Sequence, residues 1–250
     1  MELVRRYTAS DLSRLTDEET SKLIRHRIDT AELDVELCWQ LLYRIEPELY
    51  DRLIQAEPLH PAILDCLPVG LDRIAEVGSG TGRLTLDLVN RAQHIIAVEP
   101  AAPLREILLR KLAHSPHGHR VTAAHGFFDL LPIPSKWADM VVTCSALKKS
   151  VSNGGDAGLR EMERVCRPGG LVAIVLPNDV EWLQDHGYRY ISFPGEVRMQ
   201  FSSLQEAVEM ARIFYPHAVA EVRRGGRASV PYEVMGISPP RDIAVKVMPT

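Results

Sequence analysis

The first part of the chain, up to about Leu67, has apolar residues spaced three or four positions apart, with charged residues between them. Leucines and isoleucines keep this spacing at Leu12, Leu15, Leu23, Ile24, Ile28, Leu37, Leu41, Leu42 and Ile45. An α-helix brings such positions onto one face, whereas a strand does not. The pattern predicts a helical segment over residues 1–68, without a strand.

From Asp72 onward the pattern changes to short apolar runs, each followed by a stretch with the period of an amphipathic helix. Alternating strands and helices are typical of a parallel sheet that carries helices on its faces. The predicted strands cover residues 73–77, 94–98, 120–124, 140–143 and 171–176, and the predicted helices cover residues 83–91, 104–113 and 157–166. Residues 69–250 are therefore expected to form one α/β domain.

The last part of the chain begins with an aromatic-rich segment after Asn178. Its aromatic side chains are Trp182, Tyr188, Tyr190 and Phe193. A helix is predicted over residues 204–214, and strands are predicted over residues 218–222 and 243–247. We expect residues 179–203 to form an insertion in the α/β domain.

The composition is that of an ordinary globular protein, with 46% hydrophobic and 25% charged residues among 250. The formal net charge of -4 disfavours a nucleic-acid partner, because proteins that bind nucleic acid gather Lys and Arg against the phosphates. The short basic run of Arg223, Arg224 and Arg227 contains two glycines and is expected to be a turn.

The cysteines and histidines predict no metal site and no disulfide framework. Cys38, Cys66, Cys144 and Cys166 form no C-x-x-C pair. His114, His117 and His119 lie between a predicted helix and the next strand, where a solvated loop is expected. The first residues lack the apolar stretch of a signal peptide, and no run of about 18 apolar residues occurs, so we expect no membrane segment and a cytoplasmic location.

Three glycines, Gly78, Gly80 and Gly82, directly follow the first predicted strand. Glycine lacks a Cβ atom, so it accepts positive φ and lets backbone N–H groups come close to a ligand at the start of a helix. Three glycines at this spacing favour a cofactor loop over an ordinary turn.

The nearest alternative is a nicotinamide dinucleotide site. Its G-x-G-x-x-G pattern needs a third glycine at the position that Arg83 occupies. The loop also lacks the lysine of a phosphate-binding P-loop. The G-x-G-x-G spacing disfavours both sites, and an NAD(P)-dependent oxidoreductase is kept as the second interpretation.

Glu99 ends the second predicted strand, 17 positions after Gly82, and Pro100 follows it. A carboxylate at the carboxyl end of that strand can accept hydrogen bonds from both hydroxyls of a ribose. We expect the glycine loop and Glu99 to bind one adenosine-type cofactor.

Together these residues resemble the class I S-adenosylmethionine-dependent methyltransferases. The family's pattern of an acidic residue, a G-x-G-x-G loop and an acidic residue ending strand two is matched by Glu76, Gly78, Gly80, Gly82 and Glu99. Residues 126–132 resemble the family's turn after strand three, and residues 138–142 resemble the start of its strand four. Residues 161–170 resemble its R-x-L-R-P-G-G segment before strand five.

The resemblance implies a doubly wound, mostly parallel seven-stranded sheet with an N-terminal helical cap. It also implies S-adenosylmethionine as cofactor and S-adenosylhomocysteine as product. The implied cofactor-binding residues are Glu76, Gly78, Ser79, Gly80, Gly82, Glu99, Pro100, Phe127, Phe128, Cys144 and Tyr50. Phe127 stands where many relatives carry an aspartate for the adenine amino group, so stacking would hold the ring instead. Tyr50 corresponds to a tyrosine that covers the cofactor in relatives, or it packs within the cap.

The resemblance assigns no catalytic residue, because residues 145–150 lack the paired histidines of many relatives. Transfer of a methyl group from a sulfonium depends mainly on aligning the acceptor with the departing sulfur. We expect a small-molecule acceptor, with neither a nucleic-acid nor a membrane partner, in a pocket between the cap, residues 145–150 and residues 179–203. A third interpretation is a non-catalytic protein that keeps the fold and the cofactor site.

Overall fold

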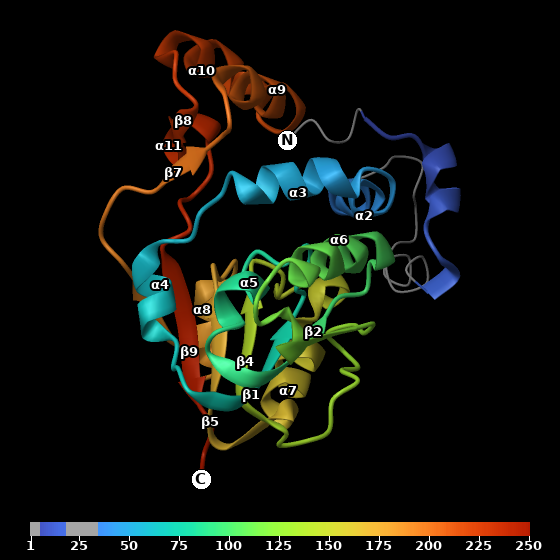
Figure 1. Ribbon diagram of the computed structural model, residues 1–250, viewed down its shortest axis with the longest axis vertical. Coiled ribbons are helices and arrows are strands. Elements are labelled where there is room, and N and C mark those ends of the chain that lie inside the picture. The colour runs from blue at the N-terminus through green and yellow to red at the C-terminus, as the bar shows by residue number, and fades with distance from the viewer. Residues whose placement is uncertain (1–5, 19–34) are drawn as a thin grey trace. The chain divides into compact units, whose positions relative to one another are not determined.

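The computed structural model describes residues 6–18 and 35–250 (Figure 1). The chain divides into two compact units, and each unit combines two separate parts of the sequence. The first, called the sheet unit here, contains residues 61–193 and 241–250. The second, called the helical unit, contains residues 1–60 and 194–240.

The sheet unit is built on a seven-stranded, mostly parallel sheet. In spatial order the strands are β3 (Val121–Ala124), β2 (Ala92–Val98), β1 (Leu71–Val77), β4 (Ala138–Cys144), β5 (Cys166–Val175), β9 (Asp242–Val247) and β6 (Arg189–Ser192). Only β9 runs antiparallel to its neighbours β5 and β6. The order along the chain reverses between β1 and β4, so the carboxyl ends of β1, β2 and β4 meet at one edge of the sheet.

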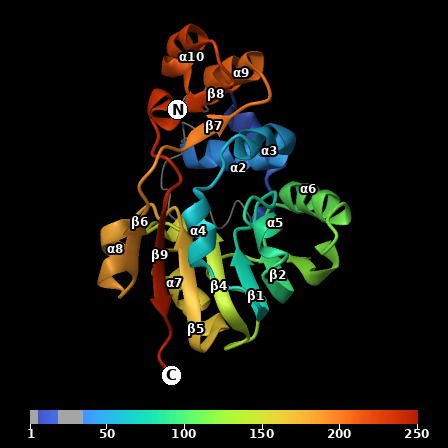
Figure 2. The same cartoon turned by 60° about the vertical axis from the view of Figure 1, so that its left-hand side comes forward.

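Helices cover both faces of this sheet. Helix α7 (Gly155–Val165) packs Leu159, Met162 and Val165 against a cluster that includes Ala75 and Val141. On the other face, α6 (Ala102–Ala113) packs Leu108 and Leu112 against Ala97. The shorter segments of this unit are α4 (Pro61–Cys66), α5 (Thr85–Leu88), η3 (Gly118–Arg120), η4 (Val151–Asn153) and α8 (Val180–Asp185). Figure 2 shows α8 beside β6, with α5 and α6 toward the side of β1 and β2.

The helical unit has a hydrophobic core of its own. Its described elements are η2 (Ala9–Arg14), α2 (Val35–Ile45), α3 (Pro47–Gln55), β7 (Arg198–Gln200), α9 (Leu204–Phe214), η5 (Pro216–Ala218), α10 (Val219–Gly225), β8 (Ser229–Pro231) and α11 (Tyr232–Met235). Leu41 and Leu42 of α2 are buried in one cluster with Met210 and Phe214 of α9. The apolar faces of segments about 170 positions apart therefore stabilise each other.

The fold class predicted from the sequence is confirmed: the sheet is doubly wound, mostly parallel and seven-stranded, and α2 and α3 form the predicted N-terminal helical segment. Leu23, Ile24 and Ile28, which contributed to that prediction, lie outside the described residues. The predicted helix over residues 83–91 is shorter in the structure, where α5 covers Thr85–Leu88.

The prediction of a strand over residues 218–222 is wrong. Helix α10 begins at Val219, and the two fully buried side chains of this stretch, Ala218 and Val222, are four positions apart. That spacing is helical, although the alternation of Ala and Val also suits a strand. The seventh strand is instead β6, within the aromatic-rich segment.

The two units differ from the boundaries expected from the sequence, which were 1–68 and 69–250. Residues 61–66 form α4 and belong to the sheet unit, while residues 194–240 belong to the helical unit. The reason is that α9 and α10 bury their apolar faces against α2 and α3 rather than against the sheet. No local sequence pattern predicts this packing between helices that are distant in the chain.

Candidate functional site

The glycine loop turns sharply away from the end of β1. The backbone N–H groups of Gly78 and Ser79 both donate to the carbonyl of Val98, at 2.8 and 3.0 Å. Gly78, Gly80 and Gly82 have φ of +74°, +53° and +96°, the left-handed region in which a Cβ atom is strained. The loop therefore lies across the carboxyl ends of β1 and β2 and depends on glycine for its path.

Neighbouring side chains also crowd the position of a Cβ atom at two of these glycines. At Gly78 it would lie 2.7 Å from the Cβ of Ala146, just after β4, and at Gly82 it would lie 2.6 Å from Cδ1 of Leu108 on α6. The loop is thus held between the segment after β4 and helix α6. Ala146 had no signal in the sequence, because its role is only to be small at this contact.

Glu99 is almost completely buried, with 6% of its surface exposed. Its Oε2 accepts a hydrogen bond from Gly80 N–H at 2.9 Å, and its Oε1 accepts one from Ala101 N–H at 2.9 Å. A carboxylate has about four lone-pair positions, so its oxygens can accept more than two hydrogen bonds. The side chain is oriented before any ligand binds.

Two cations of α6 fix the backbone around Glu99 and the loop. Arg105 donates to the carbonyl oxygens of Glu99 and Pro100, and Lys111 donates from Nζ to the carbonyl of Thr81 at 3.0 Å. These residues were not predicted, because Lys and Arg on an amphipathic helix are usually solvated. Their contacts arise only from the packing of α6 beside the loop.

Glu76 lies at the end of β1, with 1% of its surface exposed. The hydroxyl of Thr85 donates to its Oε2 at 2.6 Å. Burial raises the pKa of Glu76 to about 8, because the low-dielectric surroundings disfavour the charged carboxylate, and the Thr85 hydrogen bond opposes this only in part. A buried carboxyl at this position is available to a polar or cationic ligand group.

Two loop hydroxyls are left without hydrogen-bond partners in the described part of the chain. Ser79 Oγ and Thr81 Oγ1 are both buried, in residues that are 4% and 1% exposed. A buried polar atom without a partner is costly and rare in folded proteins. Together with the glycine geometry and Glu99, these hydroxyls fit a loop that holds a polar cofactor.

The segment after β3 brings two aromatic rings to the same edge of the sheet. The ring of Phe128 lies against Gly78, since a Cβ atom there would be 3.6 Å from its Cε2 and Cζ. The ring of Phe127 meets that of His125 edge-on at 5.4 Å between centroids. Phe128 is therefore adjacent to the glycine loop, as the sequence-based prediction of an adenine site requires.

The segment after β4 is strained at its first residue. Ser145 has φ +57° without being glycine, and its N–H donates to the carbonyl of Val175 at 2.9 Å. Such backbone costs about 1–3 kcal/mol and often occurs at functional sites. Cys144, half-buried at the end of β4, precedes it, and Lys149 N–H donates to Asp179 at 2.8 Å.

Comparison with known proteins agrees with this geometry. Residues 74–170, which include the glycine loop, Glu99 and both phenylalanines, match the family model described as a methyltransferase domain. Residues 74–170 carry a methyltransferase domain. The match favours this interpretation of the glycine loop over a nicotinamide site.

The relatives match only part of this chain, and only part of their own length is matched. An uncharacterized methyltransferase of Anoxybacillus flavithermus is 29% identical over 99 residues, which are 40% of this chain and 44% of that protein. One of Mycobacterium bovis is 28% identical over 123 residues, 48% of this chain and 47% of that protein. The chain thus spans less than half the length of both relatives. The YcgJ protein of Bacillus subtilis shares the fold, with a TM-score of 0.50 and 14% identity over 76% of this chain and 97% of that chain.

Tyr50, the remaining predicted cofactor residue, belongs to α3 of the helical unit and not to the methyltransferase domain's sheet unit. Its ring meets those of Tyr43 and Trp39 edge-on, at 4.7 and 6.2 Å between centroids. Trp39 in turn stacks on Phe214 at 6.0 Å. Tyr50 therefore has a packing role in this unit, and its role toward a cofactor stays a prediction.

The aromatic-rich segment does not form the insertion that the sequence predicts. Trp182 and Tyr188 are buried in the core beside α7, and Tyr190 on β6 donates to Asp242 at 2.9 Å. These side chains attach α8 and β6 to the edge of the sheet. The expectation that residues 179–203 line an acceptor pocket has no support from Trp182 and Tyr188.

The histidines considered in the sequence lie away from the sheet's carboxyl edge. His117 and His119 are at η3, before β3 begins, and the described residues contain no cluster of three His, Cys, Asp or Glu suited to a metal. Arg223 and Arg224 lie in the last turn of helix α10, so the turn expected from the sequence is wrong for these two residues, and Gly226 at φ +61° follows the helix. No helix in the described part of the chain is long and apolar enough to cross a membrane.

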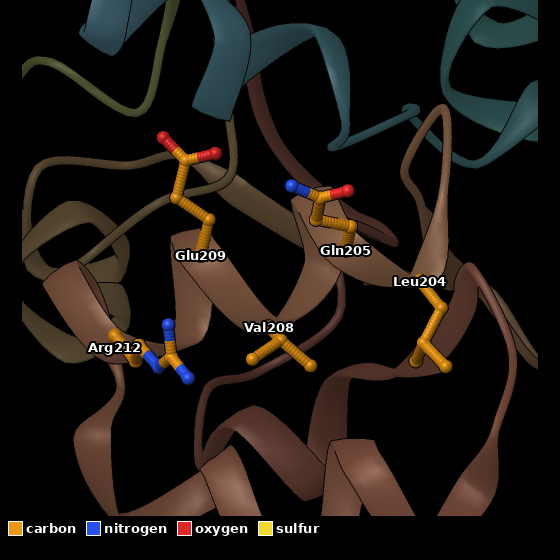
Figure 3. A pocket seen from close by; sticks show the side chains of 5 residues that line it. All are labelled: Leu204, Gln205, Val208, Glu209 and Arg212. Atoms are coloured by element: carbon orange, nitrogen blue, oxygen red, sulfur yellow. The ribbon is translucent and has the colours of Figure 1, made fainter.

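The helical unit also contains a hollow of about 520 Å³ along one face of α9. Figure 3 shows its lining side chains, which are Leu204, Gln205, Val208, Glu209 and Arg212. None of the residues predicted to bind a cofactor lines this hollow. The candidate site is therefore assigned to the carboxyl edge of the sheet.

Proposed function

We propose that this chain is an S-adenosylmethionine-dependent methyltransferase that acts on a small-molecule acceptor. The observation that carries the proposal is Glu99, which ends β2 and is oriented by Gly80 N–H inside a methyltransferase domain. An acid at this position and a loop of three left-handed glycines supply the two contacts that an adenosine-type cofactor needs.

Each part of the site would hold one part of the cofactor. The loop N–H groups and the hydroxyls of Ser79 and Thr81 suit the polar amino-acid portion, and Glu99 suits the ribose. Phe127 and Phe128 suit the adenine ring by stacking. S-adenosylmethionine, when bound, supplies a methyl group that is already activated on a sulfonium.

Glu76 would contribute charge to the same site. Its pKa near 8 in the free protein reflects burial, and a cationic ligand group close to it would favour the ionised form. Binding of a cationic cofactor would then release a proton from this carboxyl. The buried position suits an electrostatic role better than proton transfer to an acceptor.

The acceptor would be methylated mainly through proximity and orientation. The described segment after β4 offers Ser145, Lys148 and Lys149 but no histidine, so we assign no general base. An amine, thiol or phenolate can attack without one, whereas an alcohol with a high pKa needs a base within hydrogen-bond reach. Amine, thiol and phenol compounds are therefore the first acceptors to test.

A small molecule is favoured over nucleic acid by charge. The net charge is -4, and two basic residues beside the glycine loop, Arg105 and Lys111, are already engaged with backbone carbonyls. A nucleic-acid methyltransferase needs a basic track along the phosphates.

Calorimetry provides the first test of this function. The protein should bind S-adenosylhomocysteine and show no binding of NAD⁺ or NADP⁺ at the same concentrations. Binding of only a nicotinamide cofactor would disprove the proposal. Pools of small amines, thiols and phenols with methyl-labelled S-adenosylmethionine then test the acceptor. Salt-sensitive binding and methylation of mixed RNA or DNA would overturn the small-molecule assignment.

A further inference from the structure

One segment of the site, residues 126–136, has no regular secondary structure to support it. It carries Phe127 and Phe128 and connects β3 to β4. Its path is instead fixed by side chains of α7, within the stretch 161–170 that resembles a family motif. Glu161 and Arg164 make these contacts.

Glu161 and Arg164 form hydrogen bonds with both donors and acceptors of residues 126–136. Glu161 Oε2 accepts the backbone N–H of Leu131 at 2.9 Å. Arg164 donates to the carbonyls of Leu131 and Ile133, at 3.3 and 3.0 Å, and to Ser135 Oγ at 3.1 Å. The two side chains are also paired with each other, at 2.6 and 2.8 Å.

The same helix supports the phenylalanine end of the segment. A Cβ atom at Gly154 or Gly158 would lie 3.0 or 2.9 Å from the Cβ of Phe128. Gly154 caps the start of α7, and Gly158 and Glu161 lie three positions apart on one face of the helix, so the three positions form a stripe that faces the segment. Phe128 is thus held between this stripe and Gly78 of the cofactor loop.

We propose that Glu161 and Arg164 are positioning residues for the cofactor: they hold residues 126–136 so that Phe127 and Phe128 stay beside the glycine loop. This inference rests on the proposed function, because it needs a cofactor whose adenine meets those rings. The pair acts through the segment and does not itself touch the cofactor.

The geometry explains why this position carries an arginine. Three acceptors on one segment and a paired carboxylate match the several N–H donors of a planar guanidinium. A lysine ammonium reaches fewer of them at once. Arg164→Lys should therefore keep part of the cofactor affinity that Arg164→Gln loses.

Arg167, three positions further along the same motif, offers a matched control. It pairs with Asp139 at 2.6 Å, and Asp139 accepts the N–H groups of Asp72 and Arg73 at the start of β1. This ion pair lies at the amino end of the strands, opposite the candidate site. Arg167→Gln removes a comparable ion pair without changing residues 126–136.

The experiment measures S-adenosylhomocysteine affinity, thermal stability and hydrogen exchange of residues 126–136 for wild type and the three variants. Without the Arg164 contacts, residues 126–136 are taken to keep the cofactor-binding conformation about a tenth of the time. Arg164→Gln then weakens S-adenosylhomocysteine binding about tenfold. The affinity of Arg164→Lys should lie between those of wild type and Arg164→Gln. Arg167→Gln should bind S-adenosylhomocysteine like wild type despite its lower thermal stability. Exchange of residues 126–136 should accelerate only in the Arg164 variants.

The outcomes separate this inference from the proposed function. A wild-type protein that binds no S-adenosylhomocysteine refutes both. If wild type binds, wild-type affinity in a folded Arg164→Gln variant overturns the positioning role, and so does equal weakening by Arg164→Gln and Arg167→Gln. Should Arg164→Gln fail to fold, Arg164→Lys decides, since unchanged affinity with unchanged exchange would likewise contradict the proposal.

Discussion

The backbone N–H of Gly80 donates a hydrogen bond to the carboxylate of Glu99 at 2.9 Å. This contact joins the loop after β1 to the end of β2, and it fixes the acid in the orientation in which it can meet a ribose. The site is therefore largely organised before a ligand binds, which lowers the ordering cost of binding. It also means that Glu99 has a structural role in addition to its proposed role in binding.

Glu99→Gln should weaken S-adenosylhomocysteine binding by about 1.5 to 3 kcal/mol, the scale of hydrogen bonds to a charged group. Glu99→Ala should in addition lower thermal stability, because it leaves the N–H groups of Gly80 and Ala101 without their acceptor. Calorimetry and thermal unfolding measure both effects. Glu106→Gln on the exposed side of α6 is the control and should change neither. Equal affinities for wild type and Glu99→Gln would rule out the ribose role.

Gly78→Ala should abolish measurable cofactor binding and destabilise the protein. Its Cβ atom meets Ala146 at 2.7 Å, in addition to the strain of φ +74°. Gly70→Ala is a close control, since Gly70 has φ +72° but nothing within 4 Å of an added Cβ atom. We expect Gly70→Ala to lose stability from backbone strain alone and to bind S-adenosylhomocysteine normally. The same loss of affinity in both variants would mean that strain, and not the loop's contacts, controls binding.

The titration of Glu76 should make the free protein less stable as pH rises. Burial raises its pKa to about 8, so between roughly pH 4.5 and 8 the folded state holds one proton more than the unfolded chain. The Glu76 contribution is complete below the unfolded pKa and decreases as pH rises through the folded pKa, by up to about 1.4 kcal/mol per pH unit.

Urea unfolding of wild type and Glu76→Gln at several pH values measures this contribution as a difference. Glu76→Gln should lose the pH-dependent term while keeping the terms of all other groups. The gap between the two stability curves should therefore change from pH 5 to pH 8 and level off above it. Parallel curves would show that Glu76 has an ordinary pKa in the folded protein.

Tyr50 is expected to respond to the cofactor through the helical segment that carries it. If α3 closes over the site, S-adenosylhomocysteine should slow hydrogen exchange in residues 47–55 by reducing their opening. Residues 204–214 of α9 belong to the same unit and serve as the internal reference. Slowing confined to α3 supports a lid, whereas identical exchange with and without ligand contradicts it.

Much of the sheet unit follows from local sequence. The runs that became β1 and β2 are apolar and short, and each ends at a residue of the site, so their pattern predicts both the strands and the edge where a ligand binds. Gly78 and Glu99 could be proposed as site residues because their chemistry is specific: only glycine suits the left-handed turn, and an acid directly after β2 suits a ribose. These properties belong to single residues and can be recognised without knowing which residues lie beside them in the fold.

Contacts between distant residues could not be predicted in this way. Lys111 donates to Thr81, and Arg164 donates to residues 131–135. In the sequence each is an ordinary cation on an amphipathic helix, because its acceptors come close only in the folded protein. The small side chain of Ala146 is decisive only because Gly78 packs against it.

The division of the chain shows the same limit. The doubly wound sheet, the glycine loop and its acid can be predicted from the sequence, because periodicity and residue chemistry act locally. The pairing of residues 194–240 with the N-terminal helices, and the place of β6 in the sheet, depend instead on long-range packing. The apolar face of a helix indicates that the helix must be buried on that side, but it does not specify the partner. The partner therefore depends on the packing of the whole chain.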